Sequence, residues 1–218
     1  MMNFEQARGN MIEQQIRTWE VLDQEVLDLL LTVKREDFVP PAYRELAFAD
    51  VEIPLGHGAA MLEPKIEARV LQALQLKKSA KVLEIGSGSG YMTALLATQA
   101  AHVYSVEIVP ELVAMACANL QRAGIANVTI ETGDGAHGWP SHAPYDAIFI
   151  SAATPVLPRE FLRQLKPGGR LIAFTGESPV VEAQLITQIT DGVFDTVNLF
   201  ETDIAPLVNA AQPERFVF

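Results

Sequence analysis

Cysteine is nearly absent from this chain. Its 218 residues include one, Cys117, which excludes a disulfide framework and a metal site built from cysteine ligands. The four histidines show no i, i+4 pairing or other metal-ligand spacing, and no Ser-His-Asp or Cys-His set points to a nucleophilic hydrolase. We therefore expect no bound metal ion and a reducing, cytoplasmic setting.

Positive charge is also scarce, with 16 Lys and Arg against 27 Asp and Glu and a net charge of -11. Nucleic-acid affinity depends largely on Lys and Arg side chains that neutralise phosphates, so an RNA or DNA partner is disfavoured. Long apolar runs are missing as well, at the N-terminus and elsewhere, so we expect neither a signal peptide nor membrane association. With 49% hydrophobic residues the chain can bury a full core, and we expect one domain over residues 1–218.

Residues 1–76 are expected to form a helical and irregular extension on the substrate side of the fold. Apolar residues recur at helical spacing over Phe4–Trp19, and Asp23 is a plausible N-cap for a second helix. Residues 42–65 carry Pro and Gly at short intervals, which predicts a long functional loop. A further helix is expected over Glu67–Leu76.

From residue 77 onward, strand and helix patterns alternate. This rhythm predicts an α/β fold of the Rossmann-like type, a mostly parallel twisted sheet with helices on both faces. Residues 181–203 are expected to form an antiparallel hairpin on the sheet edge, and the apolar tail Pro213–Phe218 to pack on the fold or on a second subunit. The expected strands are Lys81–Ile85, His102–Ile108, Val128–Thr132, Tyr145–Ser151 and Arg170–Thr175, and the expected helices are Tyr91–Gln99, Pro110–Ala123 and Arg159–Leu165.

The most informative segment is Lys81–Tyr91, where a hydrophobic strand leads into three glycines at alternate positions and then into a helix. The G-x-G-x-G spacing is one residue tighter than the dinucleotide fingerprint. Glycine allows a sharp turn and lets the backbone lie against a ligand. A nucleoside without a pyrophosphate suits such a loop, and S-adenosyl-L-methionine meets that description. The residues expected to bind it here are Glu84, Gly86, Ser87, Gly88 and Gly90.

Two further strand ends carry acids. Because ligands of open parallel sheets bind beyond the carboxyl ends of the strands, these acids are expected at the same site. Glu107, with Ile108 beside it, lies about twenty residues beyond the first glycine, the distance typical of a ribose-binding carboxylate. Asp134, followed by Gly135, is expected to accept a hydrogen bond from the adenine amino group. Small residues near Ser151 leave space for a substrate.

Five segments stand out together: Val33–Pro40 (VKREDFVP), Ile53–Gly58 (IPLGHG), Val82–Tyr91 (VLEIGSGSGY), Gly133–Gly135 (GDG) and Leu165–Leu171 (LKPGGRL). In this order and spacing, across most of the chain, they resemble the protein-L-isoaspartate O-methyltransferase family. The resemblance implies a class I methyltransferase fold that uses S-adenosyl-L-methionine. It also implies methylation of the carboxylate of isoaspartyl residues in damaged proteins or peptides.

The substrate side departs from the pattern of this family. The family usually has Gln-Thr-Ile-Ser, one further residue and Pro after the glycine pair, whereas this chain has Ala59–Pro64 (AAMLEP). Leu62 takes the position of the active-site serine and Ala60 that of the threonine, while His57 lies in the preceding loop, where it can approach a substrate. Losing one hydrogen bond to a charged group costs about 1.5 to 3 kcal/mol, or roughly 10- to 150-fold. Glu63 would in addition repel a carboxylate.

Three functions therefore stay open. The first is an O-methyltransferase acting on isoaspartyl residues, whose ionised carboxylate needs no general base. The second is a divergent methyltransferase for another carboxylate or a small molecule. The third is a module that binds S-adenosyl-L-methionine without catalysis. A tRNA methyltransferase is disfavoured by the acidic balance, and an oligomer remains an open expectation.

Overall fold

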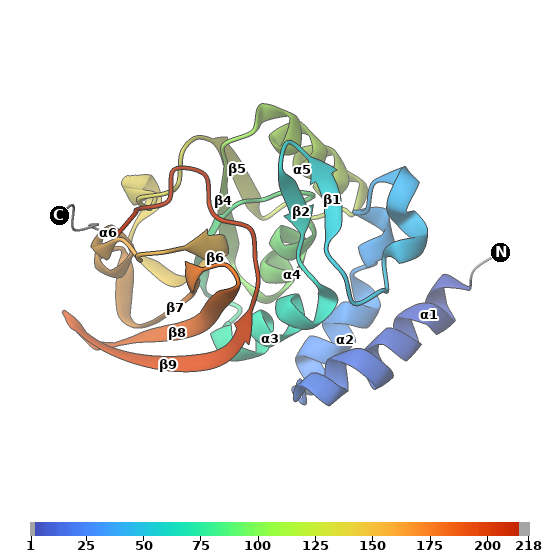
Figure 1. Cartoon of the computed structure of the whole chain (residues 1–218), viewed down its shortest axis with the longest axis horizontal. Coiled ribbons are helices and arrows are strands. Elements are labelled where there is room, and N and C mark those ends of the chain that lie inside the picture. Colours follow the sequence, from blue (N-terminus) through green and yellow to red (C-terminus); the bar gives the residue numbers. More distant parts are fainter. Residues whose placement is uncertain (1–2, 214–218) are drawn as a thin grey trace.

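A seven-stranded sheet forms the centre of the computed structural model, which describes residues 3–213 (Figure 1). The strand order is β5-β4-β3-β6-β7-β8-β9, in which β3 to β7 are parallel and β8 and β9 are antiparallel at one edge. The predicted mostly parallel α/β sheet and its antiparallel edge strands are confirmed. The strands are β3 Lys81–Ile85, β4 His102–Glu107, β5 Val128–Thr132, β6 Tyr145–Thr154, β7 Leu165–Glu177, β8 Val180–Thr190 and β9 Val193–Thr202.

Helices cover both faces of the sheet. Successive strand residues point to opposite faces, so Val82 joins a larger buried cluster and Leu83 a smaller one. The larger cluster also contains apolar residues of the N-terminal segment and of α3, α4 and α5, whereas Phe161 of α6 belongs to the smaller cluster. The helices are α3 Pro64–Leu74, α4 Tyr91–Gln99, α5 Pro110–Arg122 and α6 Arg159–Arg163.

The N-terminal segment is helical, as its apolar spacing predicts. Its first helix is not a regular α-helix throughout: after Met11 it continues as a π-helical turn and then as a 3-10 turn that ends at Trp19. Asp23 does cap the second helix: its Oδ1 accepts a hydrogen bond from the backbone N–H of Glu25 at 2.9 Å. The elements are α1 Phe4–Met11, a π-helical turn Ile12–Ile16, a 3-10 turn Arg17–Trp19, α2 Gln24–Thr32, and 3-10 turns Arg35–Asp37 and Pro41–Leu46.

A small hairpin replaces part of the predicted loop. Strands β1 (Ile53–Gly56) and β2 (Ala59–Met61) pair antiparallel, so the prediction of irregular structure over residues 42–65 is wrong here. Residues 56–58 all have positive φ, at 85°, 55° and 77°, a conformation that glycine adopts without strain. The glycines that suggested a loop therefore form the turn of the hairpin, and Pro64 begins α3 directly after β2.

The Pro167-Gly168-Gly169 turn lies inside β7. This strand begins at Leu165, which the sequence assigned to the preceding helix, and its pairing with β6 is irregular between Tyr145 and Ala147. After β9, residues 204–209 return across the carboxyl ends of the strands, and this segment is called the strap below (Figure 1). It is tied to β6 by backbone hydrogen bonds from Ala153 N to Ala205 O (2.9 Å) and from Leu207 N to Ala153 O (2.7 Å). Residues 214–218 of the predicted apolar tail lie outside the described part of the chain.

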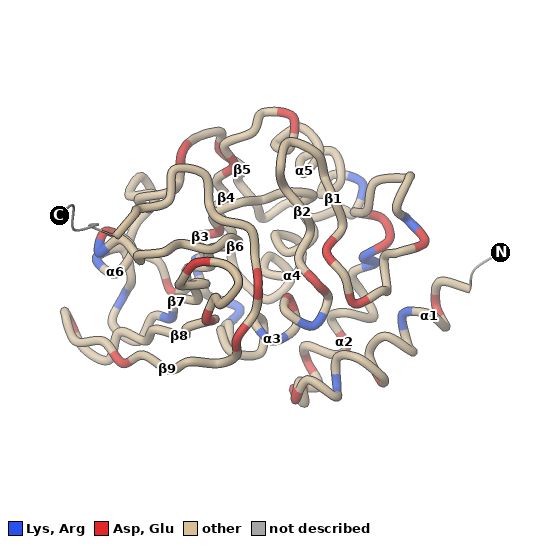
Figure 2. The backbone as a smooth tube through the Cα atoms, viewed as in Figure 1, with Lys and Arg blue, Asp and Glu red and all other residues tan. Residues whose placement is uncertain are grey.

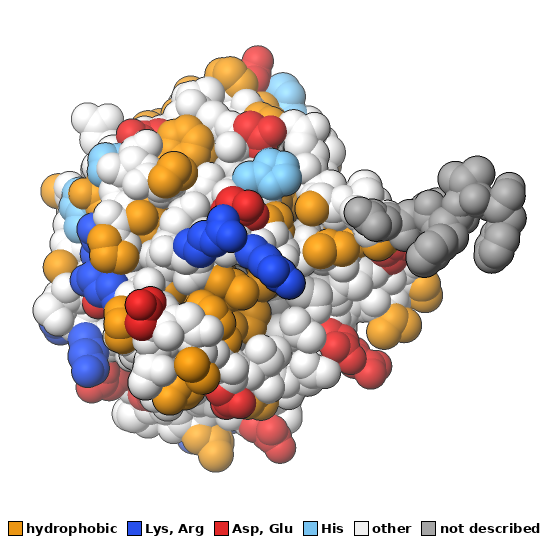
Figure 3. Space-filling view, turned by 90° about the vertical axis from the view of Figure 1, so that its left-hand side faces the viewer, with side chains coloured by type: hydrophobic (Ala, Val, Ile, Leu, Met, Phe, Trp, Pro, Cys, Tyr) orange, Lys and Arg blue, Asp and Glu red, His pale blue; other side chains and the backbone are white. Residues whose placement is uncertain are grey.

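Charged residues are distributed over the whole backbone trace, with acidic ones in excess (Figure 2). On the face drawn in Figure 3, Lys and Arg side chains lie among acidic and hydrophobic ones and form no continuous basic surface. Within residues 3–213, the helices are too short or too polar to cross a bilayer.

Candidate active site

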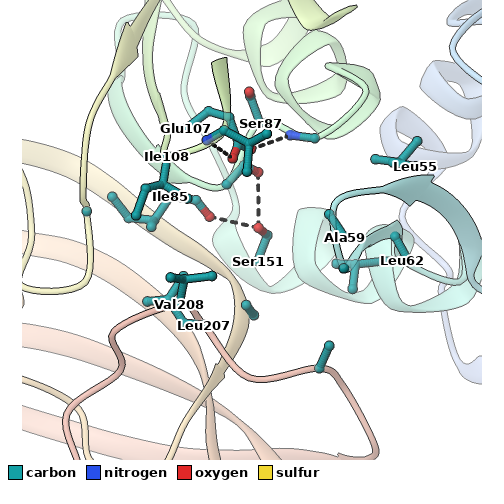
Figure 4. A pocket seen from close by; sticks show the side chains of 18 of the residues that line it. Leu55, Ala59, Leu62, Ile85, Ser87, Glu107, Ile108, Ser151, Leu207 and Val208 are labelled. Atoms are coloured by element: carbon teal, nitrogen blue, oxygen red, sulfur yellow. Dashed lines mark hydrogen bonds between the residues drawn. The ribbon is translucent and has the colours of Figure 1, made fainter. Parts of the chain in front are cut away.

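One cavity opens at the carboxyl ends of the parallel strands (Figure 4). The space between its walls is about 1060 Å³, a volume that includes open solvent at the mouth of the cavity. Its walls come from the β1–β2 hairpin, the glycine loop after β3, the loops after β4 and β5, and the strap. The acidic residues Glu52, Glu67, Glu107 and Asp134 line it, whereas no Lys or Arg of the described chain does. Such a lining favours a ligand that is neutral or positively charged and carries no phosphate.

The glycine loop forms one wall of this cavity. Gly86 has a φ of 91°, and a Cβ at this position would overlap the Oγ of Ser151, so only glycine fits here. Ser151 Oγ donates to the carbonyl oxygens of Ile85 at 2.7 Å and Gly86 at 3.0 Å, which fixes the path of the loop (Figure 4). The buried Oγ of Ser87 has no hydrogen-bond partner within residues 3–213. Because Ser87 lines the cavity, this hydroxyl is available to a ligand.

Glu107 joins the glycine loop to the end of β4. Its Oε2 accepts from the backbone N–H of Gly88, and its Oε1 from that of Val109, both at 3.0 Å. The side chain is 6% exposed and lines the cavity. Each carboxylate oxygen has a further lone pair, so Glu107 can still accept hydrogen bonds from two adjacent hydroxyl groups. This is the geometry of a ribose-binding carboxylate.

Asp134 connects the loop after β5 to the strap. Its Oδ1 accepts from the backbone N–H of Ala136 at 2.9 Å, and its Oδ2 accepts from Nδ2 of Asn209 at 2.8 Å. The strap residues Leu207 and Val208 lie below Ile85 and Ile108 in Figure 4. The strap therefore contributes apolar side chains to a slot that suits a flat, largely apolar ring.

The β1–β2 hairpin forms the wall across the cavity from these residues. Ala59 and Leu62 lie on that side in Figure 4, and His57, at the tip of the hairpin, also lines the cavity. Near the rim, partial burial together with the neighbouring carboxylates of Glu63 and Asp203 raises the pKa of Glu52. This wall is apolar in its interior and acidic at its edge.

Comparison with known proteins identifies the chain. Residues 6–212 match the family described as Protein-L-isoaspartate(D-aspartate) O-methyltransferase (PCMT). The chain belongs to this family. The Protein-L-isoaspartate O-methyltransferase of Myxococcus xanthus is 49% identical over 156 residues, 72% of this chain and 74% of the relative. That of Gloeobacter violaceus is 39% identical over 205 residues, 94% of this chain and 100% of the relative.

Solved structures of the PCMT family share the fold. One, of a protein-L-isoaspartate O-methyltransferase, matches with a TM-score of 0.78 at 27% identity, over 91% of this chain and 65% of its own. Another is that of a putative protein-L-isoaspartate O-methyltransferase from Plasmodium falciparum in complex with S-adenosyl-L-homocysteine. It has the same TM-score of 0.78 at 22% identity, over 95% of this chain and 99% of its own. The class I methyltransferase fold expected from the resemblance is thereby confirmed.

Most residues predicted for the cofactor lie on the cavity wall, but two do not. Glu84 is 0% exposed and accepts hydrogen bonds from Thr93 Oγ1 (2.5 Å) and Ser105 Oγ (2.6 Å), which hold it behind the glycine loop. A Cβ on Gly90 would meet Ala116 of α5, so this glycine allows two helices to approach each other. The predicted residues that do line the cavity are Gly86, Ser87, Gly88, Glu107, Ile108, Asp134, Gly135, His57 and Leu62.

The strap and Glu67 line the cavity without having been predicted. The strap follows the last strand as a short apolar segment, and nothing in its sequence indicates a return to the sheet. Glu67 did leave a signal, because it precedes the buried residues Val70 and Leu71 by three and four positions and so lies on the apolar face of α3. Burial raises the pKa of its carboxyl group, opposed by the neighbouring guanidinium of Arg35.

Proposed function

We propose that this member of the PCMT family transfers a methyl group from S-adenosyl-L-methionine to a carboxylate, with isoaspartyl residues of damaged proteins as acceptors. One observation carries the proposal: a single cavity joins the glycine loop, Glu107 and Asp134 to the β1–β2 hairpin. A cofactor held by the glycine loop, Glu107 and Asp134 would present its methyl group toward the β1–β2 hairpin. Family membership and the names of the relatives support the same activity.

The residues present suit this cofactor. Glu107 offers both carboxylate oxygens toward ribose hydroxyls, and Ile108, Leu207 and Val208 provide apolar contacts for adenine. Asp134 would accept from the adenine amino group, while Gly135 allows the loop after β5 to pack closely against Ile85 and Val106. The acidic, Lys-free and Arg-free lining suits a ligand with a sulfonium cation and no phosphate.

The protein would accelerate the reaction by alignment. S-adenosyl-L-methionine supplies an electrophilic methyl group on a sulfonium, which an ionised carboxylate can attack in line without a general base. The glycine loop and Glu107 fix one reactant, and the hairpin fixes the other. With both reactants bound, the apolar side chains of Leu62 and of the strap would limit the access of water to the reacting atoms.

Incubation with labelled S-adenosyl-L-methionine and an isoaspartyl peptide tests the proposal. We expect base-labile methyl incorporation well above that into the matched aspartyl peptide. Equal incorporation into both peptides, or none, would reject the isoaspartyl acceptor. Protein or peptide substrates in the cytoplasm are part of the proposal, and the single cysteine, with no disulfide, is consistent with that location.

A second candidate, methylation of a different acceptor, is favoured by the hairpin wall. Ala60 and Leu62 offer no hydroxyl, no Lys or Arg of the described chain lines the cavity, and Glu52 adds an acid at the rim. The double variant Leu62→Ser with Ala60→Thr separates the two candidates. A gain of isoaspartyl methylation from near zero favours a different natural acceptor, whereas substantial activity before the change favours the first candidate. Ala59→Ser is the matched control, since it adds a hydroxyl elsewhere in the same wall.

A further inference from the structure

A buried carboxylate at the cavity has no part in the proposed function described so far. Glu67, on α3, is 2% exposed and lines the cavity. Its Oε2 accepts a hydrogen bond from Arg35 Nη1. Arg35 is the one side chain of residues 3–213 that hydrogen-bonds to this carboxylate. The second carboxylate oxygen, Oε1, can therefore still accept a hydrogen bond from a donor group on a ligand.

A second polar side chain without a partner lies beside it. Tyr91, at the start of α4, is 2% exposed and also lines the cavity, and its buried hydroxyl has no partner within the described chain. Arg35 connects the two residues: its guanidinium lies 5.0 Å from the centre of the Tyr91 ring and pairs with Glu67. Its Nη2 also donates to the carbonyl oxygen of Leu62 at 2.7 Å. One buried arginine thus holds three parts of the wall in fixed positions.

The position of Glu67 along the cavity indicates what it would meet. Asp134 and Ile108 suit adenine, and Glu107 suits the ribose, so the amino acid portion of the cofactor would extend past the glycine loop in the other direction. Leu62 lies across the cavity from Glu107 in Figure 4, and Glu67 and Tyr91 belong to the same part of the lining because Arg35 contacts all three. The amino acid portion carries an α-ammonium group, a donor of charge-assisted hydrogen bonds. Glu84 is also a buried acid, and two hydroxyl groups donate to its Oε2, but unlike Glu67 it does not line the cavity.

We propose that Glu67 accepts a hydrogen bond from the α-ammonium group of the bound cofactor and that Arg35 is the positioning residue that holds Glu67 for it. The proposal rests on the cofactor part of the proposed function and is independent of the methyl acceptor. It assigns to α3 a direct role in cofactor binding that the glycine loop alone does not provide.

Calorimetry with two probes tests this role without any turnover. The probes are S-adenosyl-L-homocysteine and its desamino analogue, in which hydrogen replaces the amino group. We expect the wild type to bind the first about 10- to 100-fold more tightly, the range for a hydrogen bond to a charged group. Glu67→Gln should reduce this preference to about 3-fold or less by weakening the first probe alone, as expected from the loss of that interaction.

Glu36→Gln is the matched control. Glu36 also pairs with a buried arginine, Arg8, and is 4% exposed, but it does not line this cavity. The variant Glu36→Gln should therefore keep the wild-type preference for S-adenosyl-L-homocysteine over the desamino analogue. Because Glu67→Gln leaves Arg35 without its carboxylate, the double variant Arg35→Met with Glu67→Leu removes both charges and should likewise show no preference.

Three results are decisive. A wild type that binds both probes equally overturns the role of Glu67 while leaving the cofactor proposal in place. A wild-type preference that survives in Glu67→Gln overturns it as well. A wild type that binds neither probe rejects the cofactor itself, and the inference with it.

Discussion

Glu84 allows the cost of a buried carboxylate beneath the glycine loop to be measured. It is 0% exposed, and the neighbouring charge that acts on its pKa is the carboxylate of Glu107, which raises it. Burial raises the pKa of Glu84 from 4.5 to about 7. The group therefore contributes stability that is fully present below pH 4.5, where both states are protonated, and is lost as the pH rises through 7. At about 1.4 kcal/mol per pH unit between the two pKa values, the loss between pH 5 and pH 8 amounts to about 2 to 3 kcal/mol.

Glu84→Gln removes this titration. The free energy of unfolding of wild type and variant would be measured in urea at pH 5 and pH 8, without cofactor, from tryptophan fluorescence. We expect the free energy of unfolding of the wild type to fall by about 2 to 3 kcal/mol relative to that of the variant between the two pH values. Any constant packing cost of the glutamine cancels in this comparison. The exposed Glu111→Gln should follow the wild type. If the difference between wild type and Glu84→Gln is the same at both pH values, the buried carboxylate does not titrate as argued.

Three further predictions concern the cavity wall. Glu107→Gln should weaken the binding of S-adenosyl-L-homocysteine by about 10- to 100-fold in calorimetry, because the new amide nitrogen would face a backbone N–H group. The control Glu111→Gln, on the surface, should leave the affinity unchanged. Gly86→Ala should lower the free energy of unfolding by more than Gly192→Ala, because a Cβ at position 86 would overlap the Oγ of Ser151. Gly192 also has a positive φ but has open space around it. Equal losses of unfolding free energy in urea would show that Ser151 moves aside at no cost. Asn209→Gly keeps the backbone conformation but removes the side-chain amide that donates to Asp134. It should speed the dissociation of S-adenosyl-L-homocysteine about 3- to 10-fold in stopped-flow measurements. An unchanged dissociation rate would mean that this hydrogen bond does not hold the strap in place.

The cofactor side of the cavity was largely predictable from the sequence because its signals are local. Glu107 ends a strand and Asp134 follows one, and the rule that strand ends share an edge is sufficient to bring both to one cavity. The direction of Glu84 was not predictable in the same way. It precedes the glycine loop by two positions, but the alternation of β3 and the hydroxyl groups of Thr93 and Ser105 turn it into the core.

The remaining walls depend on contacts between distant segments. Asn209 meets Asp134 across 75 positions of the sequence, and Arg35 meets Glu67 across 32. No periodicity in either segment encodes such a pairing: the pattern of α3 places Glu67 on its apolar face but does not indicate which residue it contacts. The hairpin was missed for a different reason: the same glycines are typical of both an irregular loop and a tight turn.

The hydrogen bond between Arg35 and the carbonyl oxygen of Leu62 bears on how the hairpin wall can differ from the family pattern. This bond fixes the backbone at Leu62 through a main-chain atom, so the path of the wall does not depend on which side chain occupies the position. A change of side chain at positions 60 and 62 would therefore alter the chemistry of the wall without requiring a new loop conformation. It follows that Leu62→Ser should present its hydroxyl from the same backbone position, which makes the double variant a test of side-chain chemistry alone.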